Sequence, residues 1–91
     1  MKRNTIDVAK FVIEAEASAL KKLAYDLPRD FLTTIEAILN TKGRVIVSGV
    51  GKSGHVGRKI AATLASTGTP ANFVHATEAS HGDLGMITPD D

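Results

Sequence analysis

Three glycines surround the most chemically informative residues of this 91-residue chain, in the pattern Gly49-x-Gly51-x-x-Gly54. Glycines permit a tight turn in which backbone N–H groups approach a ligand, and a helix that begins there adds partial positive charge. Lys52 and Ser53 lie inside this turn and add an ammonium group and a hydroxyl donor. The combination favours a compact anionic ligand.

The glycine pattern alone leaves alternatives open, because dinucleotide-binding proteins, phosphosugar-binding proteins and turns that bind nothing share it. Glu78 lies about where an acidic residue would hold the ribose of a dinucleotide, which keeps that alternative open. A magnesium-nucleotide P-loop is excluded, because the first glycine of its G-x-x-x-x-G-K-S pattern would have to stand at Ile46.

A second polar group follows, with His75 and His81 as its imidazoles and Glu78, Ser80 and Asp83 beside them. Imidazoles could transfer a proton to a sugar hydroxyl or bind a divalent metal ion. Two histidines do not form a metal site by themselves, so zinc is the weaker of these two interpretations. His55 is assigned no role.

Composition excludes several classes of protein. The chain has 11 Lys and Arg residues against 10 Asp and Glu residues, and this near-neutral balance gives no electrostatic footprint for nucleic acid. It has no Cys, which excludes a disulfide scaffold, a thiolate metal site and a cysteine nucleophile. No apolar run approaches the ~18 residues of a membrane span. We therefore expect a cytoplasmic protein without a nucleic-acid or membrane partner.

The first forty residues predict two helices. Apolar residues recur at spacings of three and four from Val8 to Leu23, which predicts the first helix. Pro28 suits the first turn of a second helix that continues to Asn40, and Gly43 lies where a left-handed residue often stops a helix. Together they predict a helical hairpin over about residues 5–40, apolar on one side.

The period changes at residue 44. The β-branched run Arg44–Ser48 predicts a strand buried on both faces. A helix follows the glycine turn and ends at Gly68 and Pro70, Ala71–His75 predicts a second strand, and a loop is expected over residues 76–91. This order predicts an α/β fold, with a βαβ unit whose two parallel strands are joined by a right-handed crossover.

Two parallel strands leave both edges of a sheet open. A parallel sheet is normally covered on both faces and contains several strands. We therefore expect the chain to be the N-terminal part of a larger, truncated α/β domain, and we expect it to self-associate through its uncovered edges and apolar face.

Four stretches of the sequence together resemble one known family. They are Arg44–His55, Ala61–Pro70, Phe73–His75 and Glu78–Met86, which contain G-x-G-K-S-G-H, S-T-G-T-P and H-G-D-L-G-M. They closely resemble the sugar isomerase (SIS) domain of the arabinose 5-phosphate isomerases, without a gap from about Gly43 to Pro89. The resemblance implies a three-layer fold with a five-stranded parallel sheet, assembled as a tetramer. Residues 1–91 would be its N-terminal portion, with the active-site loop within residues 44–91 and the later strands and a CBS pair absent.

The resemblance also implies an activity, the interconversion of D-ribulose 5-phosphate and D-arabinose 5-phosphate on the pathway to the Kdo sugar of lipopolysaccharide. Lys52 would be the catalytic residue. The substrate-binding residues would be Gly51, Ser53, Gly68, Thr69, His75 and His81. No cofactor would be required, but His75 could take an inhibitory zinc ion. The family's base and phosphate loop come from later segments, so we expect the 91-residue chain by itself to be inactive.

Two other functions remain as alternatives. One is a non-catalytic SIS module that senses a sugar phosphate for a regulator, which has less reason to carry both Lys52 and the segment His81–Met86. The other is a dinucleotide-binding oxidoreductase, which a charged lysine inside the glycine turn disfavours.

Overall fold

The computed structural model describes residues 4–91, apart from the side chain of Asp83. The chain divides into two units, Met1–Leu32 and Thr33–Asp91, which we describe separately. None of the helices among residues 4–91 is long and apolar enough to cross a membrane.

Helix α1, Thr5–Tyr25, confirms the first predicted helix. Its N-cap is Asn4, whose side-chain oxygen accepts a hydrogen bond of 2.8 Å from the backbone N–H of Asp7. Asp7 in the first turn and Lys22 in the last turn carry the charges that complement the helix dipole. Local capping therefore fixes where α1 begins.

Helix α2, Phe31–Leu39, confirms the second predicted helix but begins later than expected. The N–H of Phe31 donates to the carbonyl of Pro28 at 3.0 Å, so Pro28 belongs to the preceding turn. The expectation that Pro28 lies in the first turn of the helix is wrong, because the carbonyl of Pro28 closes a separate turn over residues 28–31 that ends where α2 begins. Since α1 and most of α2 fall in different units, their packing as a hairpin stays a prediction.

Gly43 does not stop α2 in the way the sequence predicts. Its φ is not in the left-handed region, which only Gly51, Gly68 and Gly82 occupy among the described glycines. A Cβ atom at Gly43 would lie 2.9 Å from the backbone carbonyl of Asp90. Glycine is therefore needed here for a close backbone approach.

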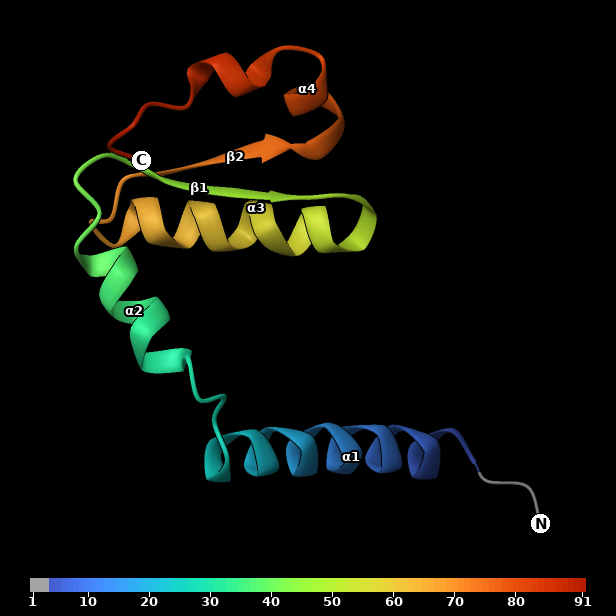
Figure 1. Ribbon diagram of the computed structural model, residues 1–91. Coiled ribbons are helices and arrows are strands. Elements are labelled where there is room, and N and C mark those ends of the chain that lie inside the picture. The colour runs from blue at the N-terminus through green and yellow to red at the C-terminus, as the bar shows by residue number, and fades with distance from the viewer. Residues whose placement is uncertain (1–3) are drawn as a thin grey trace. The chain divides into compact units, whose positions relative to one another are not determined.

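The sheet consists of two parallel strands in the described part of the chain, β1 (Val45–Gly49) and β2 (Ala71–His75). Figure 1 shows them side by side, and their register pairs Val45 with Ala71 and Gly49 with His75. The predicted βαβ order and parallel pairing are confirmed. The carboxyl ends of both strands meet at one edge, where Gly49 and His75 face each other.

Helix α3, Gly51–Ser66, packs along both strands. Its buried residues are Gly54, Gly57 and Ala61, all small, which lets the helix approach the sheet closely. The sheet contributes Val74 to this core. Strand β1 is only half-buried, so the burial on both faces that the sequence predicts is not reached among the described residues.

The segment after β2 is not the loop that the sequence predicts. It forms α4 (Ala76–Ser80) and a 3-10 helix, η1 (Asp83–Met86). These elements have five and four residues, too few for a periodic apolar pattern to reveal them. Figure 1 shows the chain returning from the carboxyl end of β2 towards the beginning of β1.

Arg44 and Asp91 hold this return in place. The Arg44 guanidinium donates to Asp91 Oδ2 at 3.1 Å, to the carbonyl of Met86 at 2.6 Å and to Asn72 Oδ1 at 3.2 Å. The Asp91 carboxylate, whose side chain is 3% exposed, also accepts from the backbone N–H groups of Thr88 and Arg44. These bonds from Thr88 and Arg44 hold the pKa of the Asp91 carboxyl well below its usual range.

Candidate active site

The glycine motif connects β1 to α3 at the carboxyl edge of the sheet. Gly49 ends β1, Val50 is the N-cap, and α3 begins at Gly51. Lys52 and Ser53 therefore lie in the first turn of a helix, at the edge where His75 ends β2. Open α/β sheets bind their ligands at this edge.

The glycines of the motif meet two different structural requirements. Gly51 has φ +56°, in the left-handed region that other residues rarely adopt. Gly49 and Gly54 face each other across the turn, where a Cβ atom at Gly54 would lie 3.0 Å from the carbonyl oxygen of Gly49. The motif is thus required by the backbone geometry of the turn, and it brings Lys52 to the sheet edge.

The first turn of α3 has no side-chain cap. Val50 makes no capping hydrogen bond, whereas side chains cap the starts of α1 and α4, the other α-helices whose N-caps the structure defines within residues 4–91. Backbone N–H groups at a helix start need an acceptor, and the helix dipole favours a negative charge there. Lys52 and Ser53 add an ammonium group and a hydroxyl at the same place. This arrangement can hold an anionic oxygen.

A hollow of about 380 Å³ lies beside this turn. Its walls come from the end of β1 and the first turns of α3, and the lining residues are Val47, Ser48, Lys52, Ser53, Val56, Gly57 and Ile60. Neither Ser48 nor the apolar wall was predicted from the sequence. The only signal for Ser48 was its position directly before the glycine motif.

His75 is half-buried and has a structural partner. Its Nδ1 accepts a hydrogen bond of 3.1 Å from the backbone N–H of Thr77, which makes it the N-cap of α4. Its ring also meets that of Phe73 edge to face, with centroids 6.5 Å apart. His75 is therefore oriented by both the strand before it and the helix after it.

His81 lies farther along the same segment. It is the C-cap of α4 and is exposed, and its backbone N–H donates to the carbonyl of Glu78 at 3.1 Å. The short helix α4 therefore separates His81 from His75, and the role of His81 as a substrate contact stays a prediction.

Gly68 and Thr69 are not brought to this edge. They follow the far end of α3, and a 16-residue helix spans about 24 Å. Gly68 has φ +102°, and the N–H of Thr69 donates to the carbonyl of Leu64 at 2.9 Å, so these residues terminate the helix. They line a separate hollow of about 310 Å³, and their contacts with substrate stay a prediction.

The second strand does not end in the acidic residue that a dinucleotide-binding site would need. In that fold the carboxylate that binds ribose is expected near the end of the second strand. Here β2 ends in an imidazole, His75, and Glu78 is an exposed residue within α4. The geometry favours a small anionic ligand over a dinucleotide.

A zinc ion does not fit the side chains that the structure describes. Among them, no group of three or more His, Cys, Asp or Glu residues is arranged to hold a metal ion. One ring nitrogen of His75 is already occupied by the Thr77 N–H. We therefore derive no step through zinc.

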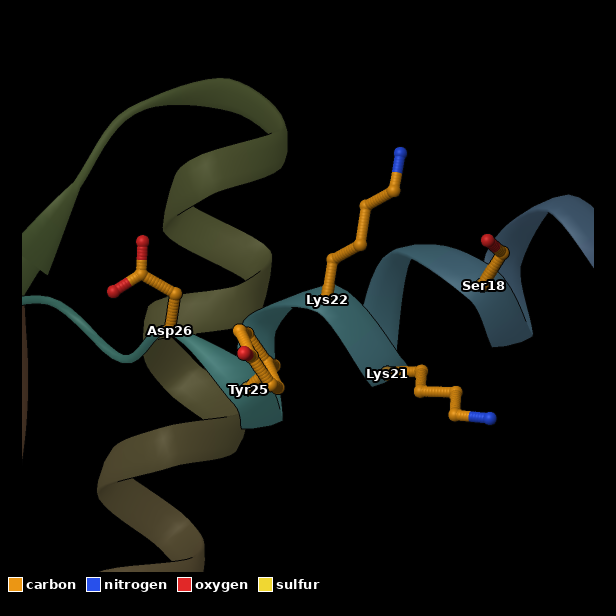
Figure 2. Close-up of a pocket in the computed structure, with 5 residues that line it drawn as sticks. All are labelled: Ser18, Lys21, Lys22, Tyr25 and Asp26. Carbon is orange, nitrogen blue, oxygen red and sulfur yellow. The ribbon is translucent and has the colours of Figure 1, made fainter.

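A further hollow, of about 500 Å³, lies on the last turns of α1. Figure 2 shows its five lining residues, Ser18, Lys21, Lys22, Tyr25 and Asp26. The ammonium ends of Lys21 and Lys22 point away from each other, and Tyr25 is almost fully exposed. Polar groups do not converge there, so this hollow is not a candidate site.

The chain is similar to curated proteins that are named as arabinose 5-phosphate isomerases. The arabinose 5-phosphate isomerase KdsD of Pseudomonas aeruginosa is 58% identical over 86 residues, which is 94% of this chain and 26% of that protein. The arabinose 5-phosphate isomerase KpsF of Escherichia coli O6:H1 is 58% identical over 77 residues, or 84% of this chain and 24% of that protein. The chain thus spans about a quarter of the length of these curated relatives.

Solved structures and family models extend the comparison. The structure of E. coli CFT073 c3406 in complex with arabinose 5-phosphate matches with a TM-score of 0.85 and 42% identity, over 98% of this chain and 49% of that chain. The family model that describes the SIS domain matches residues 38–91, which contain both strands, α3 and the candidate site. The chain belongs to the SIS domain family.

Proposed function

We propose that this chain carries part of the active site of a phosphosugar aldose–ketose isomerase that interconverts D-ribulose 5-phosphate and D-arabinose 5-phosphate. The observation that carries the proposal is the Lys52 ammonium in the uncapped first turn of α3, at the edge where His75 ends β2. Relatives named arabinose 5-phosphate isomerase, and a structural neighbour in complex with arabinose 5-phosphate, support this choice of substrate.

The chemistry gives Lys52 a specific role. Aldose–ketose isomerisation removes a proton from the carbon next to a carbonyl and passes through an enediolate, whose oxygen gains negative charge. A fixed positive charge beside that oxygen stabilises the transition state more than the ground state. The apolar side chains of Val47, Val56 and Ile60 line the same hollow as Lys52. Where the rest of such a protein covers this hollow, its low polarity would strengthen the electrostatic effect of Lys52.

We assign the remaining steps of the reaction to residues outside this chain. The chain spans about a quarter of its curated relatives, and we assign the base and the main phosphate contacts to the rest of such a protein. A homo-oligomer, a tetramer in the family, and a place in the lipopolysaccharide pathway belong to the same proposal. Sugar phosphates carry charges that do not cross membranes unaided, so we propose that the enzyme acts in the cytoplasm.

A coupled assay on the full-length protein that contains these residues tests the proposal. Ribulose 5-phosphate should be converted to arabinose 5-phosphate without added metal or nucleotide. Binding of the sugar phosphate without turnover would instead support the regulatory module. Saturable binding of a nicotinamide dinucleotide, with no response to the sugar phosphate, would support the oxidoreductase.

A further inference from the structure

The hydrogen bond at His75 determines which ring nitrogen carries a proton. Nδ1 accepts the backbone N–H of Thr77 at 3.1 Å, and a nitrogen that accepts a hydrogen bond has no proton of its own. The neutral imidazole then carries its proton on Nε2. We infer that the Thr77 N–H, as the positioning group, holds His75 as the Nε2–H tautomer, so that the substrate contact already expected of His75 is a hydrogen bond that Nε2–H donates to an oxygen of the sugar phosphate.

The surroundings of His75 support a fixed ring. The backbone of His75 has φ −64° and ψ 133°, the extended conformation typical of an N-cap, so the side chain is set to meet the start of α4. Phe73 contacts the ring edge to face, and Phe73 is itself covered by the Arg58 guanidinium at 4.4 Å from its centroid. A half-turn of the imidazole would break the cap, and a rotation out of the present ring plane would also change this aromatic contact.

This tautomer limits what His75 can do in the reaction. A neutral imidazole has one lone pair that can accept a proton, and in His75 it lies on Nδ1 and is occupied by Thr77. His75 therefore cannot be the base that removes the substrate proton. The free position is an N–H, which suits a hydroxyl, carbonyl or phosphate oxygen.

The same tautomer opposes metal binding. A metal ion at Nε2 would need the proton to move to Nδ1, where it would meet the N–H of Thr77 and remove the cap of α4. Metal binding must therefore overcome the loss of a hydrogen bond, and no group of three or more ligands is arranged for it among the described residues. The tautomer is independent of the proposed function, whereas the sugar-phosphate oxygen as its acceptor rests on it.

Nuclear magnetic resonance of the protein labelled with ¹⁵N-histidine tests the tautomer directly. At about pH 8, where an ordinary imidazole is neutral, long-range proton–nitrogen correlations identify the protonated nitrogen. The signals that disappear in His75→Asn belong to His75, and they should show protonated Nε2 and unprotonated Nδ1. A proton on Nδ1, or an even mixture of the two tautomers, would overturn the inference.

Two substitutions separate the cap from the donor. His75→Asn keeps a short side-chain oxygen for the Thr77 N–H but lacks the distant donor, whereas His75→Gln has an amide N–H near the Nε2 position. If the donor contacts substrate, His75→Asn should lower kcat/KM by about 2- to 12-fold, the effect of one neutral hydrogen bond, and His75→Gln should lower it less. His55→Gln, which removes another imidazole, is the control and should leave kcat/KM unchanged.

The remaining outcomes are equally decisive. Losses of about 10²- to 10⁴-fold in both His75 variants would indicate a proton-transfer role and contradict the inference. Added Zn²⁺ should leave the Nε2–H signal of His75 in place, and its replacement by a metal-bound signal would contradict it as well. If the wild-type protein turns over no sugar phosphate but His75 shows the expected tautomer, the proposed function fails and the tautomer stands.

Discussion

The close approach of Gly49 and Gly54 leads to a prediction about how the turn that carries Lys52 is held. A Cβ atom at Gly54 would lie 3.0 Å from the carbonyl oxygen of Gly49, and one at Gly49 would lie 3.1 Å from the backbone N of Gly54. The opposing atoms are backbone, so neither can rotate away. Gly54→Ala must therefore move the first turn of α3 away from the end of β1.

Two opposing effects set the size of the change. Overpacking of this kind costs about 1–3 kcal/mol, whereas replacing glycine by alanine within a helix gains up to about 1 kcal/mol. We expect Gly54→Ala to destabilise the protein by about 1 kcal/mol net, although helix propensity alone predicts a gain. Because Lys52 belongs to the same turn, kcat/KM should fall as well.

A double-mutant cycle tests the cause. Once one added methyl group has moved the helix, the second has more space. The double variant Gly49→Ala/Gly54→Ala should therefore lose less free energy of unfolding than the sum of the two single variants, by about 0.5 kcal/mol or more. Gly85→Ala is the control, because Gly85 has no atom within 4 Å of its added Cβ and no left-handed φ. Urea denaturation measures each variant, and a Gly54→Ala protein as stable as wild type, or more stable, would refute the close-approach reasoning.

Four further predictions concern Lys52, Asp91 and the 91-residue chain by itself. In the full-length protein, Lys52→Ala should lower kcat by about 10²- to 10³-fold with little change in KM, and Lys52→Arg should restore little; steady-state kinetics with an intact kcat would remove Lys52 from the chemistry. Asp91 has a depressed pKa in the folded state, so its stabilising contribution is complete above its unfolded pKa of about 3.9 and declines as pH falls below it. The difference in stability between wild type and Asp91→Asn should therefore be largest near neutral pH and shrink below about pH 4. A difference that stays constant with pH would show that the charge of Asp91 does not contribute to stability. The 91-residue chain alone should show no isomerase activity and should self-associate, and a stable monomer in sedimentation, or turnover above the buffer rate, would contradict these expectations.

The sequence predicts the βαβ unit well because its signals are strong and local. The run Ala71–His75 forms β2 with the predicted bounds, and β1 is shifted by one residue because Gly49 still pairs with His75. Gly68 ends α3 as expected, since only a residue that tolerates positive φ fits after the last turn. In each case the residue type reports a backbone requirement that depends on few neighbours.

Predictions from the sequence fail where a contact between residues far apart in the chain determines the backbone conformation. The position of Gly43 predicts a helix stop, but its close approach to Asp90 involves residues 47 positions apart in the sequence. A loop is expected over residues 76–91 because neither α4 nor η1 is long enough to show a period, and the bonds of Arg44 to Met86 and Asp91 hold that segment in place. Periodicity and propensity contain no information about such partners.

In the candidate site, too, some residues follow from local signals in the sequence and others do not. Lys52, Ser53 and His75 lie at the same edge of the sheet because parallel strands place their carboxyl ends together, which element order alone predicts. The paired motif at Gly68 and Thr69 lies one helix length away, where positive φ and a hydrogen bond to Leu64 already account for both residues. The left-handed φ of Gly68 and the hydrogen bond of Thr69 explain why both residues suit the end of α3, whereas their contacts with substrate stay a prediction.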